Sequence, residues 1–162
     1  GVAIADYNND GLQDIFFTGN MTGNKLYLND GKMHFTDATE VAKLQAAGRW
    51  STGVAAVDIN NDGLMDLYVG ASIKNDASLR ANMLFINKGP DAEGKPVFSD
   101  EAVAYNVADT GHTTNAAFFD YDNDGDLDLY ILTNKVGEDR YPNQYKKKRI
   151  RNTKTYKPAS YN

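Results

Sequence analysis

Acidic residues recur at a fixed spacing in three short loops of the chain. Each loop has Asp at positions 1, 5 and 9, Asp or Asn at position 3, and Gly at position 6. The loops begin at Asp6, Asp58 and Asp120. Calcium takes six to eight oxygen ligands, and a glycine permits the sharp turn that brings them together. The pattern therefore predicts three calcium sites.

Each loop is expected to supply five oxygen donors: the side chains at positions 1, 3, 5 and 9 and the backbone carbonyl at position 7. The predicted ligands are Asp6, Asn8, Asp10, Leu12 and Asp14 in the first loop, Asp58, Asn60, Asp62, Leu64 and Asp66 in the second, and Asp120, Asp122, Asp124, Asp126 and Asp128 in the third. Leu12, Leu64 and Asp126 would contribute carbonyls. Water can complete each shell.

Two other interpretations of these loops fit the sequence less well. An EF-hand would need an acidic residue at position 12, on a helix leaving the loop. Position 12 is Phe17, Val69 or Ile131, each within a run typical of a strand. Asp, Asn and Gly also form ordinary polar turns. Three copies disfavour that reading, because like charges about 4 Å apart repel by about 4 kcal/mol at an effective dielectric constant near 20.

Strands are expected on both sides of every loop, and they would position the ligands. They enter the loops at residues 1–5, 54–57 and 116–119 and leave them at 15–18, 67–70 and 129–132. Further strands are predicted at 25–28 and 34–37, joined by a tight Asp-Gly turn. The segments 24–29 and 35–37 recur as 82–87 and 98–100. Four antiparallel strands per repeat indicate the blade of an all-β propeller, with a helical turn or irregular crossing at 38–47 and 101–107.

The repeats divide the chain into residues 1–52, 53–114 and 115–162. The third repeat is incomplete and ends in a polar, basic tail, so the chain is predicted to form about two and a half blades of a larger ring. The run Lys146-Lys147-Lys148-Arg149-Ile150-Arg151 is interpreted as a solvated loop rather than a nucleic-acid surface. Trp50 and His112 precede two loops at the same distance, which favours packing at a blade edge over chemistry.

Composition limits the class of protein. The 162 residues are 41% hydrophobic and 24% charged, with a net charge of -5, which is typical of a globular domain. No apolar run approaches the roughly 18 residues of a membrane span, so no membrane insertion is expected. Cysteine is absent, so a metal would need oxygen ligands. The chain opens at Gly1 directly on a strand, and it is expected to be part of a longer precursor.

The repeats resemble FG-GAP/VCBS repeats, and among these they are similar to the cartilage acidic protein, or ASPIC/UnbV-associated, group. The likeness covers residues 1–133 and rests on Gly53-Val54-Ala55 before the second loop, Asp128-Leu129-Tyr130 in the third repeat, and Asn24 to Asn29 with Phe35-Thr36-Asp37. It implies a calcium-binding β-propeller, usually extracellular, periplasmic or surface-attached, that serves adhesion, glycan or protein binding, or scaffolding. Gly70-Ala71-Ser72 departs from the Gly-Ala-Pro of integrin repeats, so an integrin-like ligand specificity is not implied.

No catalytic residue is predicted. The chain lacks a Gly-rich phosphate loop and a Gly-x-Ser-x-Gly elbow, and the loop carboxylates are assigned to metal. A non-enzymatic module is therefore expected, with calcium and an extracellular protein or glycan as partners and no nucleic acid. The alternative is part of a calcium-dependent enzyme like a polysaccharide lyase, because some lyases resemble this propeller. Turnover of pectic polysaccharides would separate the two classes.

Overall fold

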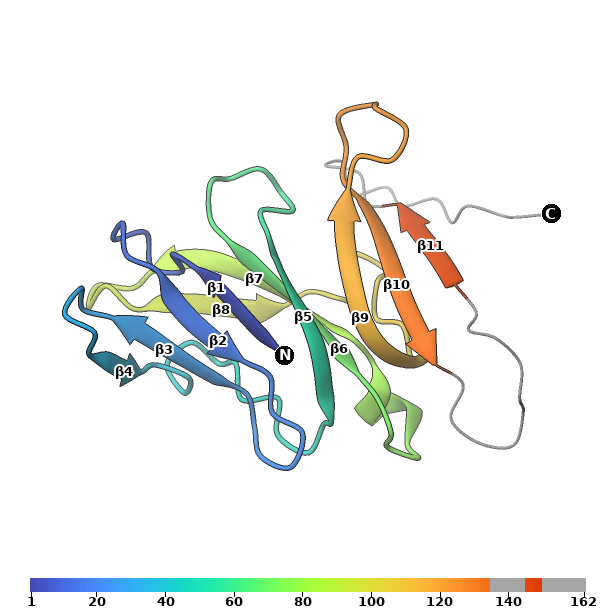
Figure 1. Cartoon of the computed structure of the whole chain (residues 1–162), viewed down its shortest axis with the longest axis horizontal. Helices are drawn as coiled ribbons and strands as arrows, with labels where there is room; N and C mark the ends of the chain where they lie inside the picture. The colour runs from blue at the N-terminus through green and yellow to red at the C-terminus, as the bar shows by residue number, and fades with distance from the viewer. Residues whose placement is uncertain (135–144, 150–162) are drawn as a thin grey trace.

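The computed structural model describes residues 1–134 and the backbone of residues 145–149, and it contains three antiparallel sheets (Figure 1). We call them the first, second and third blades. The first is β1 (Val2–Ala5), β2 (Asp14–Phe17), β3 (Lys25–Asn29) and β4 (Phe35–Asp37); the second is β5 (Ser51–Val57), β6 (Asp66–Ala71), β7 (Met83–Pro90) and β8 (Pro96–Asp100); the third is β9 (His112–Phe119), β10 (Asp128–Asn134) and β11 (Tyr145–Arg149). Within each blade, neighbouring strands are also consecutive in the chain. The predicted all-β class and the four-stranded propeller blade are confirmed.

Two of the inner strands begin earlier than predicted. β5 starts at Ser51 and β9 at His112, so both include small polar residues before the apolar run. The pairing of β5 with β6 shifts register between Ser51 and Val54. The pairing of β9 with β10 shifts between Leu132 and Thr133. Backbone pairing continues past these irregularities, which a pattern of alternating hydrophobicity cannot reveal.

The basic run was predicted to be a solvated loop, and this prediction is wrong for residues 146–149. They belong to β11, which pairs with β10 from Asp128 opposite Arg149 to Leu132 opposite Tyr145. The physical reason is that the outer edge of β10 presents backbone N–H and C=O groups that an extended segment can pair with, whatever its side chains. Ile150 and Arg151 lie outside the described residues.

Each connection between blades contains a helical turn followed by irregular backbone, and these segments include the predicted 38–47 and 101–107. The N–H of Ala42 donates to the carbonyl of Ala38 at 3.0 Å, and that of Tyr105 donates to the carbonyl of Glu101 at the same distance. A single 3-10 turn, η1 (Ala77–Arg80), follows β6. None of the helices within the described ranges has the length and apolar character needed to cross a membrane.

Adjacent blades pack face to face through two apolar cores. The core between the first and second blades includes Phe16, Leu26, Leu44, Leu67, Val69, Met83, Phe85 and Phe98. The core between the second and third blades includes Tyr68, Leu84, Ile86, Val107, Leu129 and Ile131. Each side of the second blade therefore faces a neighbour, as in the interior of a propeller.

The inner strands β5 and β9 approach closely, and Thr18, the residue after β2, contacts β5. The Thr18 hydroxyl donates to the Thr52 carbonyl at 2.6 Å, and the Thr52 hydroxyl donates to the Thr113 carbonyl at 2.8 Å. A Cβ placed on Gly53 would lie 2.6 Å from the Thr114 carbonyl oxygen, closer than real Cβ contacts. Glycine at position 53 thus permits the distance between β5 and β9.

Two neighbouring phenylalanines of β2 allow a matched test of the interblade core. Phe16 is fully buried, whereas Phe17 is 44% exposed. We expect Phe16→Ala to lower the free energy of unfolding by about 3–5 kcal/mol, because it removes a buried ring and leaves a cavity. Phe17→Ala should cost about 1 kcal/mol or less. Urea unfolding of both variants measures the difference, and equal losses would contradict this packing.

Candidate metal sites

The three acidic loops have the same internal geometry. Each joins the first strand of its blade to the second, so the loops project from corresponding ends of the three sheets (Figure 1). The carboxylate at position 1 accepts hydrogen bonds from the N–H groups at positions 5 and 6. These distances are 3.1 and 2.7 Å for Asp6, 3.1 and 2.9 Å for Asp58, and 3.1 and 2.9 Å for Asp120. A side chain therefore closes every turn.

Two residues in each loop have a left-handed backbone conformation, with positive φ. Gly at position 6 has φ of 86°, 84° and 87° in the three loops, and Asn at position 4 has φ of 60°, 57° and 57°. Glycine has no steric penalty there, and asparagine tolerates this region better than most residues. The sequence interpretation used the glycine but missed Asn9, Asn61 and Asn123. Their repetition at position 4 was the available signal.

The carboxylate at position 5 folds back on the end of the turn. Asp10 accepts from the N–H of Leu12 at 2.8 Å, Asp62 from Leu64 at 2.9 Å, and Asp124 from Asp126 at 3.1 Å. The position-7 residues are thereby held beside the acidic side chains. Leu12, Leu64 and Asp126 are half-buried, and metal ligation by their carbonyls stays a prediction.

The aspartate at position 9 differs from the others because it is buried. Asp14, Asp66 and Asp128 accept from the N–H at position 2 of their own loops, at 2.9, 3.0 and 3.0 Å. In the first two blades the other carboxylate oxygen accepts a hydrogen bond from a backbone N–H of the third strand. The N–H of Asn29 donates to Asp14 at 2.9 Å, and the N–H of Asn87 donates to Asp66 at 2.7 Å. Position 9 thus anchors the loop to the sheet.

Burial also changes the acidity of the position-9 carboxyls of the first two loops. Burial raises the pKa of Asp66 to about 6, against the opposing effect of the N–H groups of Asn87 and Ile59, and the charges of Asp62 and Asp58 add to the rise. The pKa of Asp14 is raised for the same reasons. The charged forms of Asp14 and Asp66 are therefore disfavoured until a cation lies nearby.

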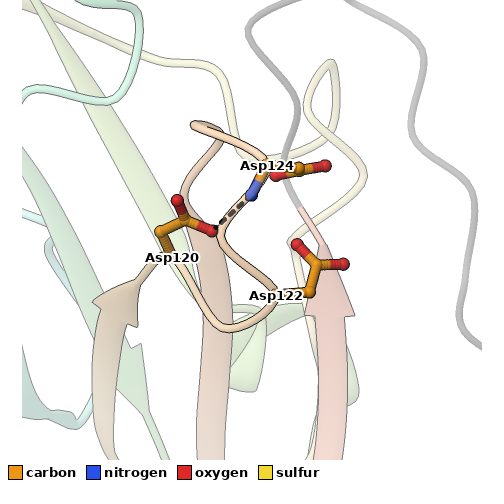
Figure 2. A group of neighbouring side chains, drawn as sticks. All are labelled: Asp120, Asp122 and Asp124. Atoms are coloured by element: carbon orange, nitrogen blue, oxygen red, sulfur yellow. Dashed lines mark hydrogen bonds between the residues drawn. The ribbon is translucent and has the colours of Figure 1, made fainter.

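The third loop brings three of its predicted ligands together. Carboxylate oxygens of Asp120, Asp122 and Asp124 lie within 4.8 Å of one another, and all three residues are exposed. Figure 2 shows these side chains around the turn, with the N–H of Asp124 bonded to Asp120. Asp128 is not part of this group, because its carboxylate lies in the buried anchoring position.

The first two loops have an amide at position 3 in place of a third exposed carboxylate. Asn8 donates to Asp10 at 2.9 Å, and Asn60 donates to Asp62 at 2.8 Å. The Oδ1 atom of Asn8 is buried and accepts no hydrogen bond. An oxygen of this kind, beside Asp10, suits a hard cation, because such a cation would supply the missing partner. The residues present therefore fit an oxygen-ligated metal.

Sequence reasoning missed Asn29 and Asn87 as residues that support the loops. Besides the hydrogen bond from its backbone N–H to the position-9 aspartate, each donates a hydrogen bond from its side-chain amide to the backbone carbonyl at position 8 of the same loop. Asn29 bonds Gln13 at 3.1 Å, and Asn87 bonds Met65 at 3.2 Å. Each is the last residue of a segment that recurs in the sequence, 24–29 and 82–87. This recurrence was the signal that could have identified the two asparagines.

His112 is held by backbone and side-chain contacts. Its Nδ1 accepts from the N–H of Ile73 at 3.1 Å and lies 3.3 Å from the Ser72 hydroxyl. The N–H of Ser72 donates to the carbonyl of Trp50 at 3.0 Å. Burial and the charge of Arg80 lower the pKa of His112. Trp50 and His112 therefore both contact the segment that follows β6.

Comparison with known proteins agrees with this architecture. Residues 6–69 match the family model for the FG-GAP-like repeat. The chain is 32% identical to cartilage acidic protein 1 of Mus musculus and of Xenopus tropicalis, and 31% identical to that of Homo sapiens. Each alignment covers 81% of this chain and 20% of the relative, so the chain spans about a fifth of the length of the curated relatives it matches. The chain therefore contains an FG-GAP-like repeat and is similar over most of its length to cartilage acidic protein 1.

Proposed function

We propose that the chain is a calcium-binding β-propeller module without catalytic activity, part of an extracellular, periplasmic or cell-surface protein. It would act in adhesion, in binding a protein or glycan, or as a scaffold. The observation that carries the proposal is the clustering of the Asp120, Asp122 and Asp124 oxygens within 4.8 Å in a turn whose geometry recurs in two other loops.

The donor set favours calcium over other metals. Each loop offers carboxylate, amide and carbonyl oxygens, which suit hard cations, whereas zinc and copper sites use imidazole or thiolate. Mg²⁺ demands near-ideal octahedral geometry and usually keeps several waters. A loop with five protein oxygens on a nine-residue turn is better matched to the larger and more adaptable Ca²⁺ shell.

The proposed location outside the cytosol follows from the calcium affinity expected of such loops. The side chains at positions 1 and 5 are exposed or half-buried in every loop, and exposed oxygen sites in extracellular modules commonly bind calcium with dissociation constants of about 10⁻⁴–10⁻³ M. Calcium at that concentration is available outside the cytosol. With the loops ordered, one rim of the blades would offer a rigid surface to a protein or glycan partner.

Calcium removal tests the proposal. At 10 to 100 times the dissociation constant, which about 10 mM calcium would reach, a ligand stabilises by about 1.4–2.7 kcal/mol per site, so three sites would add about 4–8 kcal/mol. Thermal melts of the purified chain should show a midpoint at least about 8 °C higher in 10 mM calcium than in excess chelator, since roughly 2–4 °C accompanies each kcal/mol. Magnesium at equal concentration is the control. Equal midpoints with calcium and with chelator would overturn calcium binding.

The number of carboxylates ranks the three loops. The third has Asp at positions 1, 3, 5 and 9, whereas Asn8 and Asn60 stand at position 3 of the others. Affinity in such loops rises with ligand charge. During a calcium titration followed by residue-resolved NMR, the amide of Gly125 should saturate before those of Gly11 and Gly63, and Asp122→Asn should remove this lead. Saturation of Gly125 last would show that charge does not set the order.

Absence of catalysis is tested with the substrates of the alternative function. Pectic polysaccharides incubated with the chain in millimolar calcium should yield no unsaturated products, because the buried aspartates at position 9 anchor the loops rather than face a substrate. Ultraviolet absorbance of the reaction measures such products. Calcium-dependent cleavage that persists through repeated purification, and is lost on substitution of a residue other than a loop ligand, would establish an enzyme.

A further inference from the structure

A row of hydrogen bonds joins the first acidic loop to the second. The N–H of Tyr7 donates to Asp14 at 2.9 Å within the first loop. The carbonyl of the same Tyr7 accepts from the side-chain amide of Asn87 in the second blade, also at 2.9 Å. The N–H of Asn87 then donates to Asp66 of the second loop at 2.7 Å. The position-9 aspartates of two loops are therefore connected through the backbone of one residue, Tyr7, and through one asparagine.

All four members of this row are shielded from water. Tyr7, Asp14 and Asp66 are fully buried, and Asn87 is 1% exposed. Hydrogen bonds in such an environment are electrostatically stronger than in water, and bonds in series polarise one another. The Tyr7 ring also packs edge-on against Phe98 of the second blade, with ring centroids 6.2 Å apart. Position 2 of the first loop is thus fixed by the neighbouring blade.

Asn87 has little freedom to turn away from Tyr7. Its amide also donates to the carbonyl of Met65 at 3.2 Å, and its Oδ1 accepts from the N–H of Gly89 at 3.0 Å. Met65 and Asp66 are positions 8 and 9 of the second loop, so the orientation of Asn87 depends on that loop. A change in the second loop is therefore passed to the Tyr7 carbonyl.

The counterpart of Asn87 in the first blade lacks the connection to another blade. Asn29 makes the same bonds to Asp14, Gln13 and Gly31 within its own blade. Within residues 1–134 its side-chain amide donates to no other blade, and the residue is only half-buried. The bond from Asn87 to Tyr7 therefore joins two blades, whereas the bonds of Asn29 lie within one.

We propose that Asn87 is a positioning residue that couples calcium binding at the first and second loops. This inference rests on the proposed calcium function. Ordering of Asp66 would hold Asn87, and Asn87 would hold the carbonyl of Tyr7, the residue whose N–H fixes Asp14. Order in either loop thus reduces the conformational entropy lost on ordering the other, and linkage makes the effect reciprocal. Couplings of this kind change affinity about 5–150-fold.

Residue-resolved NMR with calcium alone as the probe tests the coupling. The dissociation constant of the first loop is measured from the Gly11 amide in the whole chain and in Asp62→Asn, which weakens the second loop. We expect the first loop to lose at least about fivefold in affinity. Loss of a negative charge also weakens cation binding on its own, so the experiment needs a variant that removes the same charge without touching a loop. Glu93→Gln removes one charge from an exposed turn of the same blade and should leave the Gly11 value within about twofold.

The role of Asn87 itself is tested by a double-mutant cycle. In Asn87→Ala, adding Asp62→Asn should no longer change the Gly11 dissociation constant, whereas in Asn29→Ala the fivefold effect should persist. If both loops bind calcium and Asp62→Asn leaves Gly11 unchanged in the otherwise unaltered chain, the coupling is overturned and calcium binding stands. If neither Gly11 nor Gly63 responds to calcium, the proposed function fails as well. Should Asn87→Ala not fold, the comparison of Asp62→Asn with Glu93→Gln still decides.

Discussion

Each complete blade depends on one buried carboxylate that accepts backbone N–H groups from two directions. Asp66 receives one bond from its own loop and one from β7, and Asp14 does the same between its loop and β3. Burying a charge without partners is costly, so these donors are needed for the side chain to be there at all. The shape of the exposed turn is therefore fixed by a buried residue that is hydrogen-bonded both to the loop and to a neighbouring strand of the sheet.

The aspartates of one loop therefore divide into two groups with different physical roles. Those at positions 1 and 5 bend the turn and remain near solvent, where a cation could reach them. The aspartate at position 9 is desolvated, and burial raises its pKa in the first and second blades. A nearby cation would favour its charged form, which links metal affinity to the packing of the strands beneath.

Much of this arrangement was readable from the sequence, because it depends on short-range patterns that are repeated. Asp, Asn and Gly at fixed spacing located the loops, and the apolar runs beside them located the strands. The strand β11 was missed because its pairing depends on the open edge of β10 rather than on its own side chains. The contact of Asn87 with Tyr7 spans 80 residues and exists only because two blades stack, so no local pattern encodes it.

The order of strands within each sheet also bears on how the chain reaches its native state. Because consecutive strands pair within each blade, most backbone pairing closes short segments and carries a small loop-closure entropy, and such hairpins form in about 1–10 μs. Contacts between blades close much longer segments and contribute to a higher contact order. A chain of this topology can condense blade by blade from its amino terminus during synthesis, each new sheet docking on a surface that the previous one has already formed.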